Sequence, residues 1–354
     1  MKKILLVIRD LKGNGAERCV INFAERFKKS SFKPYIICFK KDVQLPISDD
    51  IPLLIFSEKF FRFIPRNIRG RIIAPFLDLF IKTKIGKPNL VLSNLMPADR
   101  LLAYSKLSNV FFIIHNTTSV EISSYYPKRI KKEMSERVTI YSKKPCICVS
   151  DGVKADLITL LKNDNDQIRT IHNGIDADHI IQSSLDTPLD LIHDCILHIG
   201  KFNNAKRQDR LLKAYAAINC DIPLVFIGVG PKMEEVKQLT KRLNLSHKVH
   251  FLGYKKNPFP YMKSARIMVL CSDFEGLGLV LLEAICLGTP VISSNCPGGP
   301  SEIVDDFNLF ETDSSKAFEN LLSRAVETPD VFRSALRDEF KIDYCIEKYI
   351  KLME

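Results

Sequence analysis

Short apolar runs alternate with longer amphipathic segments along almost the whole chain, and this alternation limits the folds that the chain can adopt. Runs rich in Ile and Val and bounded by polar residues are typical of strands buried on both faces of a parallel sheet. The segments between them, such as 16–28, are long enough to form crossover helices. The pattern therefore predicts an α/β protein with parallel sheets.

The apolar runs fall into two consecutive series, which favour two Rossmann-like domains over one large sheet. The expected strands are 4–8, 34–39, 90–93, 110–115 and 146–150, and then 195–199, 224–227, 249–252, 267–271 and 290–293. A polar, proline-containing link at 176–193 separates the two series. We expect an N-terminal domain over 1–180, a C-terminal domain over 181–332, and a final helix within 333–354 with one apolar stripe.

Composition excludes several protein classes. Of the 354 residues, 46% are hydrophobic and 26% are charged, unlike a disordered or collagen-like chain. No apolar run reaches the roughly 18–20 residues that span a bilayer. Residues 1–8 begin as a signal peptide does, but Arg9 and Asp10 interrupt the run and no small-residue cleavage site follows. We therefore expect a cytoplasmic protein whose ten cysteines are mostly buried, reduced thiols.

The positive charge is concentrated in the first half of the chain. Residues 1–180 contain 31 Lys and Arg against 18 Asp and Glu, whereas the whole chain has a net charge of +11. Two stretches, 58–73 and 127–144, combine cations with aromatic residues, including Tyr125 and Tyr126 just before the second. Such stretches suit an anionic membrane surface. A solvated basic helix is the alternative, and nucleic acid is disfavoured because no nucleic-acid-binding motif is found.

Three loops that follow predicted strands have the composition of ligand sites. In 12–18, Gly13 and Gly15 let backbone amides approach a ligand, although a tight strand-to-helix turn explains them equally well. In 200–208, Lys201 and Lys206 are spaced to converge on a diphosphate, with a solvated basic loop as the alternative.

The third loop, 274–284, is the most specific because it runs from a strand into a helix. Its glycines free amide donors at the helix N-terminus, where phosphate or sugar oxygens bind. Glu283 follows Glu275 by about two helical turns and lies within an apolar run. A glutamate there is costly unless a hydrogen-bonding group such as a ribose diol contacts it.

Four motifs together resemble glycosyltransferase family 4, whose members have the GT-B fold and retain anomeric configuration. They are the Glu275/Glu283 pair, the Lys201–Lys206 loop, the G-x-G-A-E-R segment at 13–18, and Asn-Gly-Ile-Asp at 173–176. The resemblance covers nearly the whole chain. It implies two parallel sheets facing each other across a cleft, with a nucleotide-sugar donor on the C-terminal domain, an acceptor on the N-terminal domain, and a final helix that crosses back to the N-terminal domain.

The resemblance also implies roles for single residues. Glu275 would contact the donor sugar, Glu283 the ribose, and Lys206 the diphosphate. Lys201 stands where the family usually has arginine, so the charge is kept but the bidentate fork is lost. His115, at the end of a predicted strand, would face the reacting sugar, although a histidine there is often only a satisfied loop residue. The remaining expected donor-binding residues are Gly15, Gly230, Tyr254, Lys255, Gly278, Leu279 and Val280.

The reaction that follows is transfer of a hexose or N-acetylhexosamine from a UDP-sugar to a surface glycan such as lipooligosaccharide, capsule or a lipid-linked oligosaccharide. We expect no metal and no other cofactor, since no D-x-D motif follows a strand and the lysines and a helix N-terminus can neutralise the leaving diphosphate. We expect peripheral association with the inner face of the cell membrane. Two alternatives remain: another GT-B enzyme, such as a nucleotide-sugar epimerase or phosphorylase, or a non-catalytic glycan- or membrane-binding paralogue.

Overall fold

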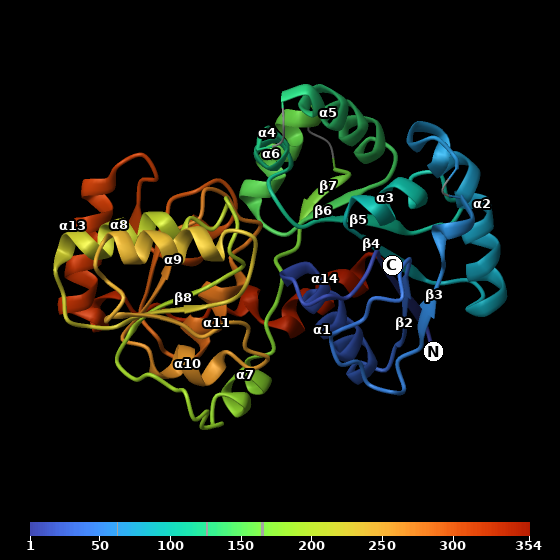
Figure 1. Ribbon diagram of the computed structural model, residues 1–354. Coiled ribbons are helices and arrows are strands. Elements are labelled where there is room, and N and C mark those ends of the chain that lie inside the picture. Colours follow the sequence, from blue (N-terminus) through green and yellow to red (C-terminus); the bar gives the residue numbers. More distant parts are fainter. Residues whose placement is uncertain (62, 125–126, 164–165) are drawn as a thin grey trace. The chain divides into compact units, whose positions relative to one another are not determined.

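The structure is a computed structural model that describes residues 1–354 except 62, 125–126 and 164–165. The chain divides into two compact units (Figure 1). The first comprises residues 1–174 and 339–354, and the second comprises residues 175–338. The boundary at 174/175 lies six residues before the expected one, because helix α7 (Ala177–Ser183) packs against α10 (Phe259–Ser264) and α11 (Leu279–Cys286) of the second unit.

The first unit is built on a parallel seven-stranded sheet in the order β3-β2-β1-β4-β5-β6-β7. The strands are β1 (Lys3–Ile8), β2 (Lys33–Cys38), β3 (Leu53–Ile55), β4 (Leu90–Asn94), β5 (Val110–Ile114), β6 (Cys146–Cys148) and β7 (Ile168–Thr170). The helices are α1 (Gly15–Lys29), α2 (Arg66–Lys84), α3 (Met96–Leu102), α4 (Thr118–Ser123), α5 (Pro127–Tyr141), α6 (Asp151–Leu161) and α14 (Ile342–Lys351). Helices α1 and α14 lie together on one face of the sheet, and α2, α3 and α5 lie on the other (Figure 1).

The second unit has a parallel six-stranded sheet in the order β10-β9-β8-β11-β12-β13. The strands are β8 (Ile196–Ile199), β9 (Leu224–Ile227), β10 (Val249–Phe251), β11 (Ile267–Leu270), β12 (Val291–Ser294) and β13 (Leu309–Phe310). Helices α8 (Gln208–Ile218), α9 (Met233–Arg242) and α13 (Ser315–Glu327) cover one face, and α7, α10 and α11 the other (Figure 1). The short helix α12 (Pro300–Ile303) follows β12.

The α/β prediction is confirmed, and each sheet contains strands that the sequence patterns did not indicate. The unpredicted strands β3, β7 and β13 each lie at the edge of a sheet. They are only two or three residues long, so they form no recognisable apolar run. The expected strand 146–150 ends at Cys148, because Ser150 instead caps α6 by accepting a hydrogen bond from the Val153 amide at 3.1 Å.

Helix α14 completes the core of the first unit. The Tyr349 ring is fully buried and lies 5.4 Å from the Phe23 ring and 6.4 Å from the Phe27 ring, both on α1. Asp343 of α14 forms an ion pair with Arg26 of α1. A β-carbon at Gly174 would lie 2.5 Å from the Ile342 Cα, so the chain leaving β7 passes close against the start of α14.

Among the described residues, no helix combines the length and the hydropathy that crossing a lipid bilayer requires.

Candidate active site

The strand order of the second sheet reverses between β8 and β11. Their neighbouring carboxyl ends form a topological switch point, where ligands bind in open parallel sheets. The loop after β8 carries Lys201 and Lys206, and the loop after β11 carries Glu275. Two of the predicted site motifs therefore meet at one edge of this sheet.

A buried phenylalanine fixes the loop after β8. The Phe202 ring is fully buried, 5.9 Å from the ring of Phe226 on β9 and 6.1 Å from that of Phe251 on β10. The Phe202 amide also donates to the Val229 carbonyl at 3.1 Å. A loop that contains a charged residue at each end is therefore held rigidly by its apolar centre.

Two glycines after β9 permit this close approach. Gly228 has a φ of +134°, and a β-carbon there would lie 2.1 Å from the Gly200 carbonyl oxygen. A β-carbon at Gly230 would lie 2.2 Å from the Phe202 carbonyl oxygen. Because Gly230 has no side chain, the loop after β9 can pack closely against the loop after β8.

Lys206 and Glu275 form a preorganised ion pair. The Lys206 Nζ atom lies 2.5 Å from Glu275 Oε1, and the Ser272 hydroxyl donates to the same oxygen at 2.6 Å. Glu275 is only 9% exposed, so the pair forms in a partly desolvated setting where charge–charge interactions are strong. The Glu275 amide donates to the Pro297 carbonyl at 3.0 Å, which fixes the backbone as well.

The N-terminus of α11 lies three residues beyond Glu275. Gly278 caps it with a φ of +98°, a conformation that a glycine adopts without strain. The first helical amides, Leu279 and Val280, have no carbonyl of the preceding turn to bind, so they are available to an anion. Glu283, one turn further along α11, is half-buried.

A clamp of charged residues joins the loops after β8 and β11. Arg207 has a φ of +48°, unusual for a residue with a side chain, and its guanidinium contacts Asp209 and Asp273 at 3.0 Å each. Arg210 adds a second contact to Asp273 at 2.6 Å, and the Asp273 amide donates to the Ala205 carbonyl at 2.8 Å. The clamp holds the two loops at a constant separation, which maintains the Lys206–Glu275 contact.

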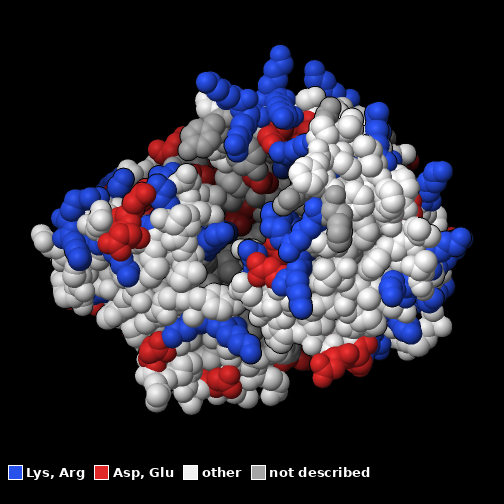
Figure 2. All heavy atoms as spheres, turned by 45° about the vertical axis from the view of Figure 1, so that its right-hand side comes forward, with Lys and Arg blue, Asp and Glu red and all other residues white. Residues whose placement is uncertain are grey.

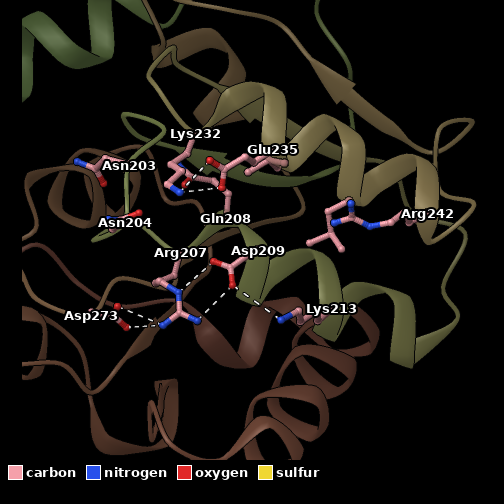
Figure 3. Close-up of a pocket in the computed structure, with 12 residues that line it drawn as sticks. Asn203, Asn204, Arg207, Gln208, Asp209, Lys213, Lys232, Glu235, Arg242 and Asp273 are labelled. Carbon is pink, nitrogen blue, oxygen red and sulfur yellow. Dashed lines mark hydrogen bonds and ion pairs between the residues drawn. The ribbon is translucent and has the colours of Figure 1, made fainter.

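A hollow of about 590 Å³ lies beside the clamp, between α8 and α9 (Figure 3). Lys232 and Glu235 pair across 2.7 Å at one side of it, and Arg207 pairs with Asp209 at the other. These ion pairs leave the lining charges largely neutralised by one another. The α11 N-terminus adds backbone amides and a helix dipole, so it is the better anion site.

The other predicted residues of the second unit differ in their surroundings. Lys201 is exposed, and Tyr254 is 52% exposed after β10. Lys255 forms an ion pair with Asp190, and the Tyr261 hydroxyl donates to the same carboxylate at 2.5 Å. Lys255 therefore anchors the segment that precedes β8.

In the first unit, the loop that contains Gly15 is filled by its own glutamate. The Glu17 carboxylate is buried and accepts hydrogen bonds from the Gly13 amide at 2.6 Å and the Asn14 amide at 2.9 Å. Gly15 is the first residue of α1. The Gly13 and Asn14 amides of this loop are thus already bound by the protein's own carboxylate.

His115 follows β5 and contacts Asn94 at the end of the adjacent strand β4. Asn94 is buried, and its side-chain amide donates to the Leu92 carbonyl at 3.0 Å and the Val7 carbonyl at 3.4 Å. Its Oδ1 must therefore accept the 2.9 Å hydrogen bond from His115 Nε2. Burial lowers the pKa of His115 to about 4, so the ring is neutral at pH 7 with Nδ1 as its acceptor.

His198, on β8, is the second neutral histidine of the chain near a predicted site. Its ring is fully buried, and Nδ1 donates to the Val269 carbonyl at 2.9 Å. A β-carbon at Gly200 would lie 3.4 Å from His198 Nε2, so the ring lies directly beneath the loop that leads to Lys206. Burial lowers its pKa to about 4.

Two family models divide the chain between them. The model described as Glycosyltransferase Family 4 matches residues 13–179, and the one described as Glycosyl transferases group 1 matches residues 189–341. The chain belongs to glycosyltransferase family 4.

Two bacterial relatives of this family match part of the chain. The N-acetylgalactosamine-N,N'-diacetylbacillosaminyl-diphospho-undecaprenol 4-alpha-N-acetylgalactosaminyltransferase of Campylobacter jejuni is 30% identical over 195 residues, 54% of this chain and 53% of that protein. The lipopolysaccharide 1,6-galactosyltransferase of Salmonella typhimurium is 25% identical over 206 residues, 52% of this chain and 56% of that protein. The matched segments span about half the length of both relatives.

A solved structure resembles the chain over its full length. Anabaena HepE in complex with UDP superposes with a TM-score of 0.77 at 18% identity and covers 99% of both chains. This likeness confirms the predicted GT-B fold.

Sequence reasoning missed several residues that support the family's motif positions. Ser272 and the Arg207–Asp273 clamp lie at strand and helix ends, where polar and charged residues are common. Their spacing in the sequence therefore does not mark them as site residues. Asn94 had a usable signal, since it is a polar residue at the carboxyl end of an apolar strand beside the switch point of the first sheet.

Proposed function

We propose that the chain is a retaining glycosyltransferase that moves a hexose or N-acetylhexosamine from a UDP-sugar to a lipid-linked or lipopolysaccharide-type glycan. The observation that carries this proposal is the Lys206–Glu275 pair beside the α11 N-terminus, at the switch point of the second sheet. Family membership and the substrates named for the two bacterial relatives support the class of reaction and of acceptor. The UDP complex of Anabaena HepE supports the choice of nucleotide.

Stabilisation of the leaving diphosphate is the main catalytic contribution that we assign. Lys206 and Lys201 supply two positive charges, and the Leu279 and Val280 amides supply the positive end of a helix dipole. Glu275 contacts the donor sugar, and Glu283 accepts from the ribose hydroxyls. These groups neutralise the diphosphate without a metal ion.

Retention follows from substitution on one face of the sugar. The bond between the anomeric carbon and the diphosphate oxygen breaks, and the acceptor hydroxyl forms its new bond on the same face. The proton of that hydroxyl passes to the departing phosphate oxygen, so atoms and charge balance within the site. His115, neutral and with Nδ1 as its acceptor, is assigned to a sugar hydroxyl.

Membrane association is the second part of the proposal. Lys and Arg form several separate groups on the face shown in Figure 2, and some of them project at the height at which α5 lies in Figure 1. Helix α5 contributes exposed cations at Lys128, Arg129, Lys131 and Lys132. Arg62, Tyr125 and Tyr126, which the sequence analysis also placed in the two basic stretches, lie outside the described residues. We assign the chain to the inner face of the cell membrane, where lipid-linked acceptors are found.

A panel of nucleotide sugars tests the enzymatic part. Thermal shift identifies the donors that bind, and slow hydrolysis of each donor without acceptor measures turnover at the reacting carbon. Lys206→Ala should abolish both signals, whereas Lys316→Ala, which removes an exposed lysine of α13, should change neither. A strict loss of activity on addition of EDTA would overturn the metal-free mechanism, and no response to any nucleotide would overturn the proposal.

A further inference from the structure

Helix α2 is apolar on two opposite faces. Its inner face carries Ile73, Leu77 and Ile81, which are fully buried. Its outer face carries a second stripe that solvent reaches: Ile68, Ile72, Phe76 and Leu79 are 40%, 41%, 53% and 58% exposed. At about 100° per residue, these four side chains fall within roughly 80° of the helix circumference. A helix with only one covered apolar face normally has polar residues on the other.

The packing of α2 prevents it from rolling to bury this stripe. A β-carbon at Gly70 would lie 2.4 Å from the Arg100 carbonyl oxygen, so α2 and α3 are already in close backbone contact. Just before α2, Phe63 is 81% exposed, which extends the apolar surface past the helix N-terminus. Contiguous exposed apolar surface of this kind marks an interaction site.

Most charged residues of α2 itself are positive, although Arg66 at its start is paired with Glu133 and Glu136 of α5. Helix α2 contains five cations and one acid, and the acid, Asp78, is turned inward to accept from the Ser105 hydroxyl at 2.5 Å and the Lys106 amide at 2.8 Å. Arg71 and Lys82 are exposed and lie about 60° and 40° around the helix from Ile68 at the edge of the stripe, and Lys84 is exposed in the last turn. On the side where α2 lies, Figure 2 shows a broad uncharged area with Lys and Arg along its upper and right-hand edges and Asp and Glu below it.

We infer that the outer face of α2, Phe63 together with Ile68–Leu79, inserts into the headgroup region of an anionic lipid bilayer. An apolar stripe flanked by cations fits such a surface, since the aromatic and aliphatic groups enter the acyl boundary while lysine and arginine reach the phosphates. Two copies of this chain that met through α2 would bring like charges together, which opposes self-association. The inference deepens the membrane part of the proposed function and depends on it.

The test uses the full chain and sedimentation with vesicles of phosphatidylcholine alone or with about one third phosphatidylglycerol. Phe76→Ser combined with Leu79→Ser should reduce binding to the anionic vesicles by tenfold or more, because both groups are exposed in the folded chain and add to stability little. Lys82→Ala with Lys84→Ala should reduce binding to the anionic vesicles by roughly thirtyfold, since each cation near the surface contributes about 1 kcal/mol. Val331→Ser, a change at a 57% exposed apolar residue of the second unit, is the matched control and should have no effect.

Insertion can be observed directly because the chain contains no tryptophan. Phe76→Trp should show a blue-shifted emission with anionic vesicles and quenching by brominated lipid, whereas Val331→Trp should show neither. Equal vesicle binding by the stripe variants and the wild type, or a dimer that the stripe variants dissociate in sedimentation velocity, would overturn the inference. UDP binding is measured by calorimetry on every variant and should equal that of the wild type. A wild-type chain that binds UDP but not anionic vesicles refutes only the membrane face, and one that binds anionic vesicles but no UDP refutes only the donor site.

Discussion

Replacing Glu275 with glutamine should strengthen the binding of UDP while it abolishes transfer. Lys206 Nζ contacts Glu275 Oε1 at 2.5 Å, and the two side chains are 23% and 11% exposed. A diphosphate that recruits Lys206 must therefore compete with an existing charge-assisted hydrogen bond, a type that contributes about 1.5–3 kcal/mol. Free UDP has no sugar for Glu275 to contact, so its affinity reports this competition alone.

The expected magnitudes follow from that competition. With Glu275→Gln, part of the pairing energy becomes available to the diphosphate, and a gain of about 1 kcal/mol corresponds to roughly fivefold tighter binding. Lys206→Met should weaken UDP binding by tenfold or more, and in that background Glu275→Gln should change the affinity little. Calorimetry on the wild type, the two single variants and the double variant forms a complete cycle.

Ser272→Ala is the control for this cycle, since it removes the 2.6 Å hydrogen bond to Glu275 but leaves the charge pair in place. It should leave UDP affinity near that of the wild type. Equal or weaker UDP binding by Glu275→Gln would refute the reasoning, because it would mean that Lys206 is not limited by its pairing with Glu275.

Three further predictions concern His115, His198 and the C-terminal helix. Asn94→Asp should raise the pKa of His115 from about 4 toward 6.5 or above, because a carboxylate stabilises the imidazolium. The titration can be followed by ¹⁵N NMR of labelled histidine, and an unchanged titration curve would contradict the tautomer assignment. Because the pKa of His198 is lowered in the folded chain, the unfolded chain takes up a proton first as the pH falls. The free energy of unfolding of the second unit should therefore fall by about 3 kcal/mol between pH 6.5 and pH 4. Urea titrations of His198→Gln should lack this contribution. Deleting residues 340–354 removes the buried Tyr349 contacts with α1 and should destabilise the first unit by about 5 kcal/mol or more; a truncated chain with the full melting temperature would exclude that role for α14.

The central strands could be predicted from sequence because burial on both faces requires continuous apolar runs. Edge strands such as β3 and β13 pack on fewer neighbours, so their residues carry no such run. The expected ends of central strands were also accurate only to one or two residues, because capping residues such as Ser150 decide where a helix begins.

The positions of the site motifs could be predicted more readily than the surroundings of their side chains. Glu275 lies in a glycine-containing loop, which suggests an open setting, yet Lys206 and Ser272 bury its carboxylate. Glu17 was a motif residue in the sequence, but its function in the structure is to hold the amides beside Gly15. The first contact joins residues far apart along the chain, and the second depends on a side chain that turns back toward its own loop. The spacing of residues in the sequence reveals neither.

The discontinuous first unit has a consequence for biosynthesis. The second unit is one continuous segment, 175–338, so every residue of it is translated before α14. A nascent chain that has reached residue 338 holds a complete second unit, while the first still exposes the apolar surface of Phe23 and Phe27 that Tyr349 will cover. The unit that begins the chain is therefore the last to be finished, and its exposed surface is what a chaperone at the ribosome would meet.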